Sequence, residues 1–146
     1  MKAYISGPMR GIDHWNFEAF DGCAAWLRGI GWEVVSPAEH DREVDPDCVD
    51  LPQYDHGDEI GQGTFHKLIG WDLMVIADPG PAKIDAIVLL PGWEPSVGVA
   101  HELYVARALG KEVCEFVQRP GKPQQWLTLL SPHEQSQRQH LAKVTA

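Results

Sequence analysis

Short apolar segments that end at Gly or Pro alternate along this chain with segments of helical periodicity. The apolar segments predict strands at residues 3–6, 32–36, 86–90 and 112–117. Between them, apolar residues at helical spacing predict helices that begin at Asn16, which caps the first, at Thr64 and at Ser96. Because strands that alternate with helices form parallel sheets covered on both faces, we predict an α/β fold. The expected architecture is a single Rossmann-like or flavodoxin-like domain with a parallel sheet flanked by helices.

The length of the chain favours one domain. With 146 residues, of which 44% are apolar, and six tryptophans, the chain is large enough to bury one hydrophobic core. We place the α/β domain at residues 1–117. A C-terminal tail at residues 118–146 is expected to pack on the domain or on a neighbouring subunit. Residues 37–63 are rich in Pro, Asp and Gly and predict an irregular excursion over the carboxyl edge of the sheet, where long excursions shape binding sites.

Charge and cysteine usage exclude several classes of partner. The net charge of -9 argues against a nucleic-acid polymer or an anionic membrane surface, whereas a small phosphorylated ligand needs only one local positive site. The three cysteines and seven histidines lack the spacing of metal ligands, so we expect reduced thiols and no metal site. No secretory signal or apolar stretch of membrane-spanning length is present, so a cytoplasmic protein is expected.

The segment from residue 89 to residue 102 combines a strand end, a Pro- and Gly-rich turn and a helix start. Ser96 is placed to cap the helix, whose first N–H groups lack partners and whose dipole favours an anion. Side chains lean toward the start of a helix, so Glu102 is expected to point over Gly98, which has no side chain. The segment predicts a phosphate-sized notch with a carboxylate one turn deeper and room for a sugar.

Two acidic residues lie beside apolar helix stripes. Glu102 falls angularly between Val99 and Ala106, and Asp72 falls four residues before Ile76. A carboxylate beside a buried stripe is costly unless it is paired or used, so the pattern favours a functional role for Glu102 over a partly exposed glutamate. For Asp72, a functional role and a solvated position on the helix are equally compatible with the sequence. Two such acids suggest one shared cavity.

The end of the first predicted strand is a second candidate binding region, because ligands of open parallel sheets bind at the carboxyl ends of strands. Candidate substrate-binding residues there are Gly7, Pro8, Met9, Arg10 and Gly11. The planar guanidinium of Arg10 suits a phosphate or a carboxylate, against the alternative of an exposed loop arginine. The segment is neither a Walker loop nor a GxGxxG fingerprint.

Aromatic residues flank both candidate regions. Tyr4 carries a hydroxyl that can donate to a nearby carboxylate, although a strand tyrosine is more often part of the core. Trp15 and Trp93 lie beside the two loops and are able to stack on a base, so Trp93 is included among the substrate-binding candidates. The other tryptophans are assigned to the core.

Three separated motifs resemble the nucleoside 2-deoxyribosyltransferase superfamily. They are Tyr-Ile-Ser-Gly-Pro-Met-Arg-Gly at residues 4–11, Leu-Pro-Gly-Trp-Glu at residues 90–94, and Ser-x-Gly-x-x-x-Glu at residues 96–102. The resemblance spans roughly residues 3–117, with the motifs in the superfamily's order. It is nearest to small bacterial and phage proteins similar to 2'-deoxynucleoside 5'-phosphate N-hydrolases.

The resemblance implies specific roles. Glu102 would be the nucleophile that attacks C1' of the sugar, Tyr4 would orient it, and Asp72 would help to protonate the leaving base. The residues that would hold a 5'-phosphate are Arg10, Ser96 and Gly98. Pro8 stands where the hydrolases commonly carry a serine, as in transferases that act on unphosphorylated nucleosides, so both substrate types stay open.

The sequence therefore predicts an enzyme that cleaves the N-glycosidic bond of a (deoxy)nucleoside or nucleoside 5'-monophosphate by double displacement on a glutamate. The free base is released, or it is exchanged for another base. No cofactor is expected, and relatives suggest a homodimer or a higher homo-oligomer. The alternative is a non-catalytic protein that binds and sequesters nucleotides in the same cleft. A phosphotransferase or NAD-type enzyme is disfavoured because the corresponding glycine-rich loops are missing.

Overall fold

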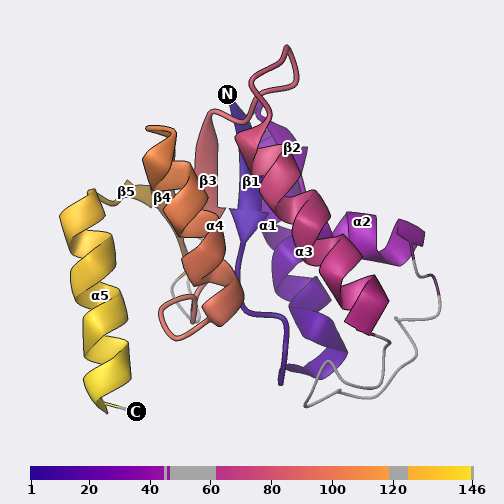
Figure 1. The fold of residues 1–146 in the computed structure, drawn as a ribbon. Helices are drawn as coiled ribbons and strands as arrows, with labels where there is room; N and C mark the ends of the chain where they lie inside the picture. Colours follow the sequence, from indigo (N-terminus) through magenta and orange to yellow (C-terminus); the bar gives the residue numbers. More distant parts are fainter. Residues whose placement is uncertain (45, 47–61, 119–124, 146) are drawn as a thin grey trace.

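A sheet of five strands forms the centre of the part of the chain that the structure describes (Figure 1). The computed structural model describes residues 1–146 apart from 45, 47–61, 119–124 and 146. The strand order is β2-β1-β3-β4-β5, and the first four strands run parallel. The strands are β1 (Lys2–Ser6), β2 (Glu33–Val35), β3 (Ala86–Leu89), β4 (Glu112–Gln118) and β5 (Gln125–Leu129).

Helices cover both faces of this sheet (Figure 1). They are a short 3-10 turn η1 (Asp13–Asn16), α1 (Phe17–Gly29), α2 (Pro37–Val44), α3 (Gln62–Ala77), α4 (Val97–Ala108) and α5 (Pro132–Thr145). Because side chains alternate along a strand, Ala3 and Ile5 of β1 pack into a core with α1, whereas Tyr4 packs into a second core with α3 and α4. The two cores confirm the predicted α/β class with helices on both faces.

The edge strand β5 departs from the predicted parallel sheet, because it pairs with β4 in the antiparallel direction. Only residues 119–124 separate the two strands, and a parallel neighbour needs a crossover of about a dozen residues or more. The predicted tail thus supplies a strand and a helix of the domain, and β4 extends one residue beyond the predicted boundary at 117.

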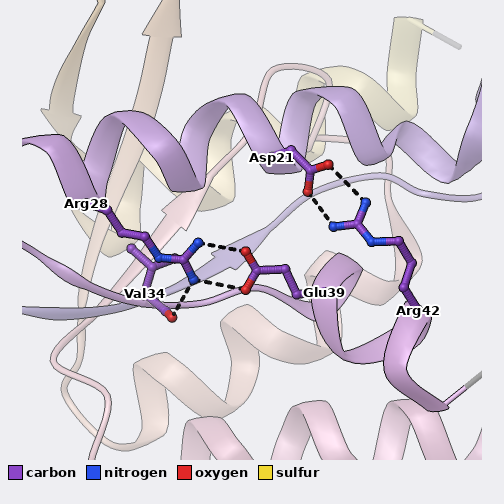
Figure 2. Close-up of polar contacts among 5 residues, drawn as sticks. All are labelled: Asp21, Arg28, Val34, Glu39 and Arg42. Atoms are coloured by element: carbon purple, nitrogen blue, oxygen red, sulfur yellow. Dashed lines mark hydrogen bonds and ion pairs between the residues drawn. The ribbon is translucent and has the colours of Figure 1, made fainter.

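The predicted irregular excursion at residues 37–63 begins instead with a helix, α2. Most of the rest of the excursion lies outside the described residues. Two paired contacts hold α2 against α1 (Figure 2). Arg28 donates to both oxygens of Glu39 at 2.7 and 2.9 Å, and Arg42 donates to both oxygens of Asp21 at 2.9 and 2.7 Å. Such two-point guanidinium-carboxylate pairs fix orientation as well as distance, so they set the position of α2.

Asn16 precedes α1 as predicted, but its side chain does not cap the helix. Its amide Nδ2 donates instead to the Pro8 carbonyl oxygen at 2.9 Å. His14, Trp15 and Asn16 all have positive φ angles, of 51°, 55° and 61°, which L-residues rarely adopt. These backbone angles form a tight turn before α1, and the Asn16 side chain of this turn is bonded to the loop that follows β1.

Gly7, which follows β1, lies in close contact with Leu90, which follows β3. A Cβ atom at Gly7 would lie 2.8 Å from Leu90 Cβ and 2.9 Å from Leu90 Cδ1. The Leu90 amide donates to the Ser6 carbonyl oxygen at 2.9 Å, so these two segments of the chain cannot easily move apart. The glycine thus has a packing reason that is independent of any ligand.

We expect Gly7→Ala to lower the free energy of unfolding by about 1–3 kcal/mol, because the added methyl group overlaps with the buried side chain of Leu90. Gly22→Ala is the matched control: Gly22 lies within α1, where a Cβ meets nothing within 4 Å. That control should raise stability by roughly 0.5–1 kcal/mol through helix propensity. Urea unfolding of both variants measures the difference, and equal effects would contradict the packing explanation.

Candidate active site

The Glu102 carboxyl group is held by two hydroxyl groups from β1. Tyr4 donates its hydroxyl proton to Glu102 Oε1 at 3.2 Å, and the Ser6 hydroxyl donates to Oε2. Tyr4 and Ser6 are two residues apart, so both point from the same face of the strand toward α4. The structure thus joins the predicted pair Tyr4 and Glu102. Ser6 is a further contact of Glu102 that was not predicted from the sequence. Its spacing of two residues from Tyr4, on the same face of the strand, is the signal that could have identified it.

The start of α4 has the predicted cap. Ser96 Oγ accepts from the Val99 amide at 3.3 Å. Gly98 is exposed, and a Cβ there would meet only Ser96 Oγ, at 3.9 Å. The helix end therefore stays open to a ligand one turn before Glu102.

Asp72 reaches the same place from α3. Its Oδ1 atom is buried and has no hydrogen-bond partner within the described structure. Burial first, and then the nearby charge of Glu102, raise the pKa of Asp72 to about 7, while hydrogen bonding to Tyr4 acts in the opposite direction. The Tyr4 hydroxyl is influenced by both acids, and burial together with these two charges raises its pKa well above the ordinary value.

The pKa of Glu102 itself is also raised to about 7. Burial is the main cause, the hydrogen bonds from Ser6 and Tyr4 oppose it, and the charge of Asp41 adds to it. The two hydroxyl donors therefore favour an ionised Glu102 in a place where burial disfavours one. This balance suits a carboxylate that alternates between charged and uncharged forms.

Asp41 of α2 is a third acid of this cluster, and sequence reasoning missed it. Burial, followed by the charge of Asp72, raises the pKa of Asp41 to about 7, and Arg42 opposes the shift. The missed signal is Ser36-Pro37, since Pro at the first position of a helix after Ser is a typical helix start. Asp41 then follows one turn later, on a helix rather than in an irregular loop.

The other predicted binding residues lie on the two neighbouring loops. A Cβ at Gly92, whose φ is +83°, would lie 3.7 Å from Pro8 Cγ, which brings the loops together. Arg10 and Gly11 are exposed in the turn after β1. Met9 packs instead against the core on the α1 side. A contact between these residues and a substrate stays a prediction.

The prediction that the Trp93 ring stacks on a base is wrong, because this side chain is buried. The side chain is 0% exposed and packs in the core formed with α3 and α4. Its Nε1 donates to Glu115 Oε1 at 3.4 Å, and the Arg138 guanidinium lies 5.4 Å from its ring centroid. Trp15 is half-buried and packs against the opposite core. Trp93 therefore anchors the loop before α4 to the core.

Arg138 of α5 connects the C-terminal helix to this loop. It donates to both oxygens of Glu115, at 2.9 and 2.7 Å, and to Glu94 Oε1. The last of these contacts reaches the loop itself, three residues before the start of α4. A residue from the predicted tail thus holds the loop before α4 in place.

A hollow of the described structure lies away from the predicted site residues. It has a volume of about 700 Å³ and lies at the amino ends of the strands, lined by residues that include Lys2, Lys83 and Asp85, and no predicted site residue lines it. Among the described residues, no group of three or more His, Cys, Asp or Glu side chains is arranged to hold a metal ion. None of the described helices is both long and apolar enough to cross a membrane.

The fold and site define an α/β protein with a buried carboxylate cluster at the carboxyl edge of its parallel strands. The chain belongs to a family described as a domain of unknown function (DUF4406), which it matches over residues 1–59 and 68–115. No curated protein matches the chain. The matched residues include β1, α2, residues 68–77 of α3 and the whole of α4. They therefore include Tyr4, Ser6, Asp41, Asp72 and Glu102.

Arg138→Met should loosen the loop before α4, because it leaves Glu94 and Glu115 without their shared cation. We expect faster amide hydrogen exchange at residues 92–96 and a loss of roughly 1–2 kcal/mol in the free energy of unfolding. Ser136→Ala is the control, because Ser136 lies on α5 like Arg138. The change removes the hydrogen bond that Arg107 Nη1 of α4 donates to Ser136 Oγ at 3.2 Å, and it does not affect a contact with the loop. Equal exchange in the two variants would contradict the anchoring role.

The raised acids predict that stability falls as pH rises from 5 to 8. The folded protein keeps protons on Asp41, Asp72 and Glu102 up to about pH 7, whereas unfolded carboxyls release theirs near pH 4. The folded state thus binds more protons in this range, and its advantage is lost as pH rises. Urea unfolding measures the free energy of unfolding at pH 5 and at pH 8. We expect its decrease between these two pH values to be smaller in Asp41→Asn than in the wild type, by on the order of 1 kcal/mol.

The exposed acid Glu112 at the start of β4 supplies the control for this measurement. Glu112→Gln should leave the difference between pH 5 and pH 8 unchanged. A wild-type stability that rises over this range would show that the acid cluster is ionised without cost.

Proposed function

We propose that this protein cleaves the N-glycosidic bond of a nucleoside or nucleoside 5'-monophosphate by double displacement, with Glu102 as the nucleophile. The observation that carries the proposal is a buried carboxylate held by two hydroxyl donors next to a second buried carboxyl with a raised pKa. The resemblance of three motifs to the nucleoside 2-deoxyribosyltransferase superfamily supports the same reading. A protein that only bound nucleotides would gain nothing from a carboxylate close to the start of α4, because the carboxylate would repel the phosphate.

In the first displacement, an oxygen of Glu102 forms a bond to C1' while the bond from C1' to the base nitrogen breaks. The electron pair of that bond leaves with the base, and protonated Asp72 gives its proton to the base. The products are a glycosyl ester on Glu102, a neutral base and an ionised Asp72. A pKa of about 7 lets Asp72 carry this proton at neutral pH.

In the second displacement, water attacks C1' and the ester bond to Glu102 breaks. Ionised Asp72 accepts the proton of the attacking water, which restores both acids to their starting states. If a second base attacks in place of water, the same steps exchange one base for another. The sugar keeps its configuration at C1' because the carbon is inverted twice.

Tyr4 and Ser6 act on the nucleophile. Each hydroxyl occupies one oxygen of Glu102, so the carboxylate is held in one rotamer before the substrate arrives. When the ester forms and the charge on Glu102 disappears, the Tyr4 hydroxyl proton becomes available to the neighbouring Asp72 carboxylate. Tyr4 thus stabilises whichever of the two acids is ionised at each step.

The open start of α4 suits the far end of the substrate. The N–H groups of its first turn and the helix dipole favour an anion next to Ser96 and Gly98. We propose that a 5'-phosphate or 5'-hydroxyl lies there and that Arg10 approaches it from the neighbouring loop.

Glu102→Ala should reduce the release of free base by about a thousandfold or more, since the variant lacks the atom that replaces the base. Tyr4→Phe should lower kcat by roughly ten- to a hundredfold with little change in KM, because it misorients the nucleophile without touching the sugar. Chromatography of nucleosides and nucleoside 5'-monophosphates incubated with each variant measures the released base.

Glu112→Gln is the control for general loss of folded protein, since this exposed acid lies far from the site on β4. Base release that persists in Glu102→Ala would remove Glu102 from its assigned role. Binding of nucleotides by the wild type without any release would favour the sequestering alternative. Methanol added as an acceptor should give a glycoside of retained configuration, and inversion would exclude double displacement.

A further inference from the structure

The two oxygens of the Glu102 carboxyl group are held by different donors. Tyr4 donates to Oε1 at 3.2 Å, which is longer than the range of about 2.5–3.0 Å that is usual between two oxygens. The Ser6 hydroxyl donates to Oε2, and this bond lowers the pKa of Glu102 more than the bond from Tyr4 does. Both donors are buried, so bulk water does not compete with them. Oε1 is therefore the more weakly held oxygen of the two.

A double displacement gives the two oxygens different tasks. One oxygen uses a lone pair to form the bond to C1', and the other becomes the carbonyl oxygen of the glycosyl ester. A hydrogen bond stabilises the lone pairs of the oxygen that accepts it, so the more weakly held oxygen is the better nucleophile. The geometry therefore suits Oε1 for the attack and leaves Oε2, with Ser6, as the carbonyl oxygen.

The carbonyl oxygen of such an ester lies close to the substituent on C2', because C2' is the neighbour of the carbon that carries the ester. In retaining glycosidases, hydrogen bonds of the sugar 2-hydroxyl group strengthen in the transition state. A 2'-hydroxyl group is placed to donate to this carbonyl oxygen, whereas a 2'-deoxy sugar has no proton to offer. Ser6 presents a hydroxyl proton to the same oxygen from the side of the protein.

We propose, on the basis of the function proposed above, that Oε1 of Glu102 attacks C1' and that Ser6, bonded to Oε2, takes the part of a substrate 2'-hydroxyl group. As the Oε1 lone pair forms the bond to C1', the electron pair of the bond to the base leaves with the base, which takes its proton from Asp72. The remaining double bond of the ester becomes fixed at Oε2. Ser6 is thus a positioning residue that frees the reaction from the need for a 2'-hydroxyl group.

Substrate pairs that differ only at C2' test this role. In Ser6→Ala, the kcat/KM for a 2'-deoxynucleoside should fall by about a hundredfold, because a hydrogen bond to a charged group is lost. The kcat/KM for the matching ribonucleoside should fall by about tenfold or less, because its 2'-hydroxyl group can donate to Oε2 in place of Ser6. The ratio of ribonucleoside to deoxynucleoside kcat/KM should therefore be at least about tenfold higher than in the wild type.

Two further substrates and variants separate the hydrogen bond from other effects. A 2'-fluoro-2'-deoxynucleoside has an electronegative substituent that cannot donate, so its kcat/KM in Ser6→Ala should fall as much as that of the deoxynucleoside. Ser6→Cys keeps a side chain of similar shape with a weak donor, and its ratio should change in the same direction. Tyr4→Phe removes the donor to Oε1 instead and should keep the wild-type ratio. Each pair is also offered as 5'-monophosphates.

A ratio of two substrates in one variant does not depend on the fraction of folded protein. A ratio unchanged within about twofold in both Ser6 variants would overturn the role of Ser6, and so would an equal change of the ratio in Tyr4→Phe. Base release by the wild type would uphold the proposed function in either case. Absence of base release from every substrate would overturn both proposals.

Discussion

The arrangement of the site depends on the burial of one carboxyl group, that of Glu102, between a strand and a helix. A buried carboxylate loses its hydration, and the loss is tolerated only where donors replace the water. Tyr4 and Ser6 are such donors, and both come from one face of β1. The contact therefore ties the direction of α4 to β1, which lies between β2 and β3 in the sheet, and the open start of the helix falls beside the end of β1.

Much of the fold and part of the site are local enough to be predicted from the sequence. The apolar segments bounded by Gly and Pro gave β1, β3 and β4 within one residue at each end. Ser96 caps α4 because a short hydroxyl side chain before a helix does so in nearly any context. Glu102 and Asp72 were detectable since each interrupts an apolar stripe, which is a property of a single helix and needs no knowledge of its neighbours.

The features that the sequence did not predict all depend on contacts between distant segments. Trp93 looks like a loop residue able to stack on a base, but Arg138, 45 positions later, and Glu115 enclose it. The antiparallel β5 depends on the short connection after β4 rather than on its own residues. Asn16 has the composition of a helix cap, yet the backbone of Pro8 competes successfully for its amide. In each case a tertiary partner overrides a local preference.

Placing three acids on three separate helices has a consequence that one acid could not have. Because α2, α3 and α4 each contribute a single carboxyl group, the charge of the cluster changes with the distances between helices, and the proton count adjusts to it. Apolar side chains of similar size would stabilise the packing of these helices better, so a purely structural role does not explain the three acids. The three acids with raised pKa values beside an open helix start are therefore part of the support for the proposed function.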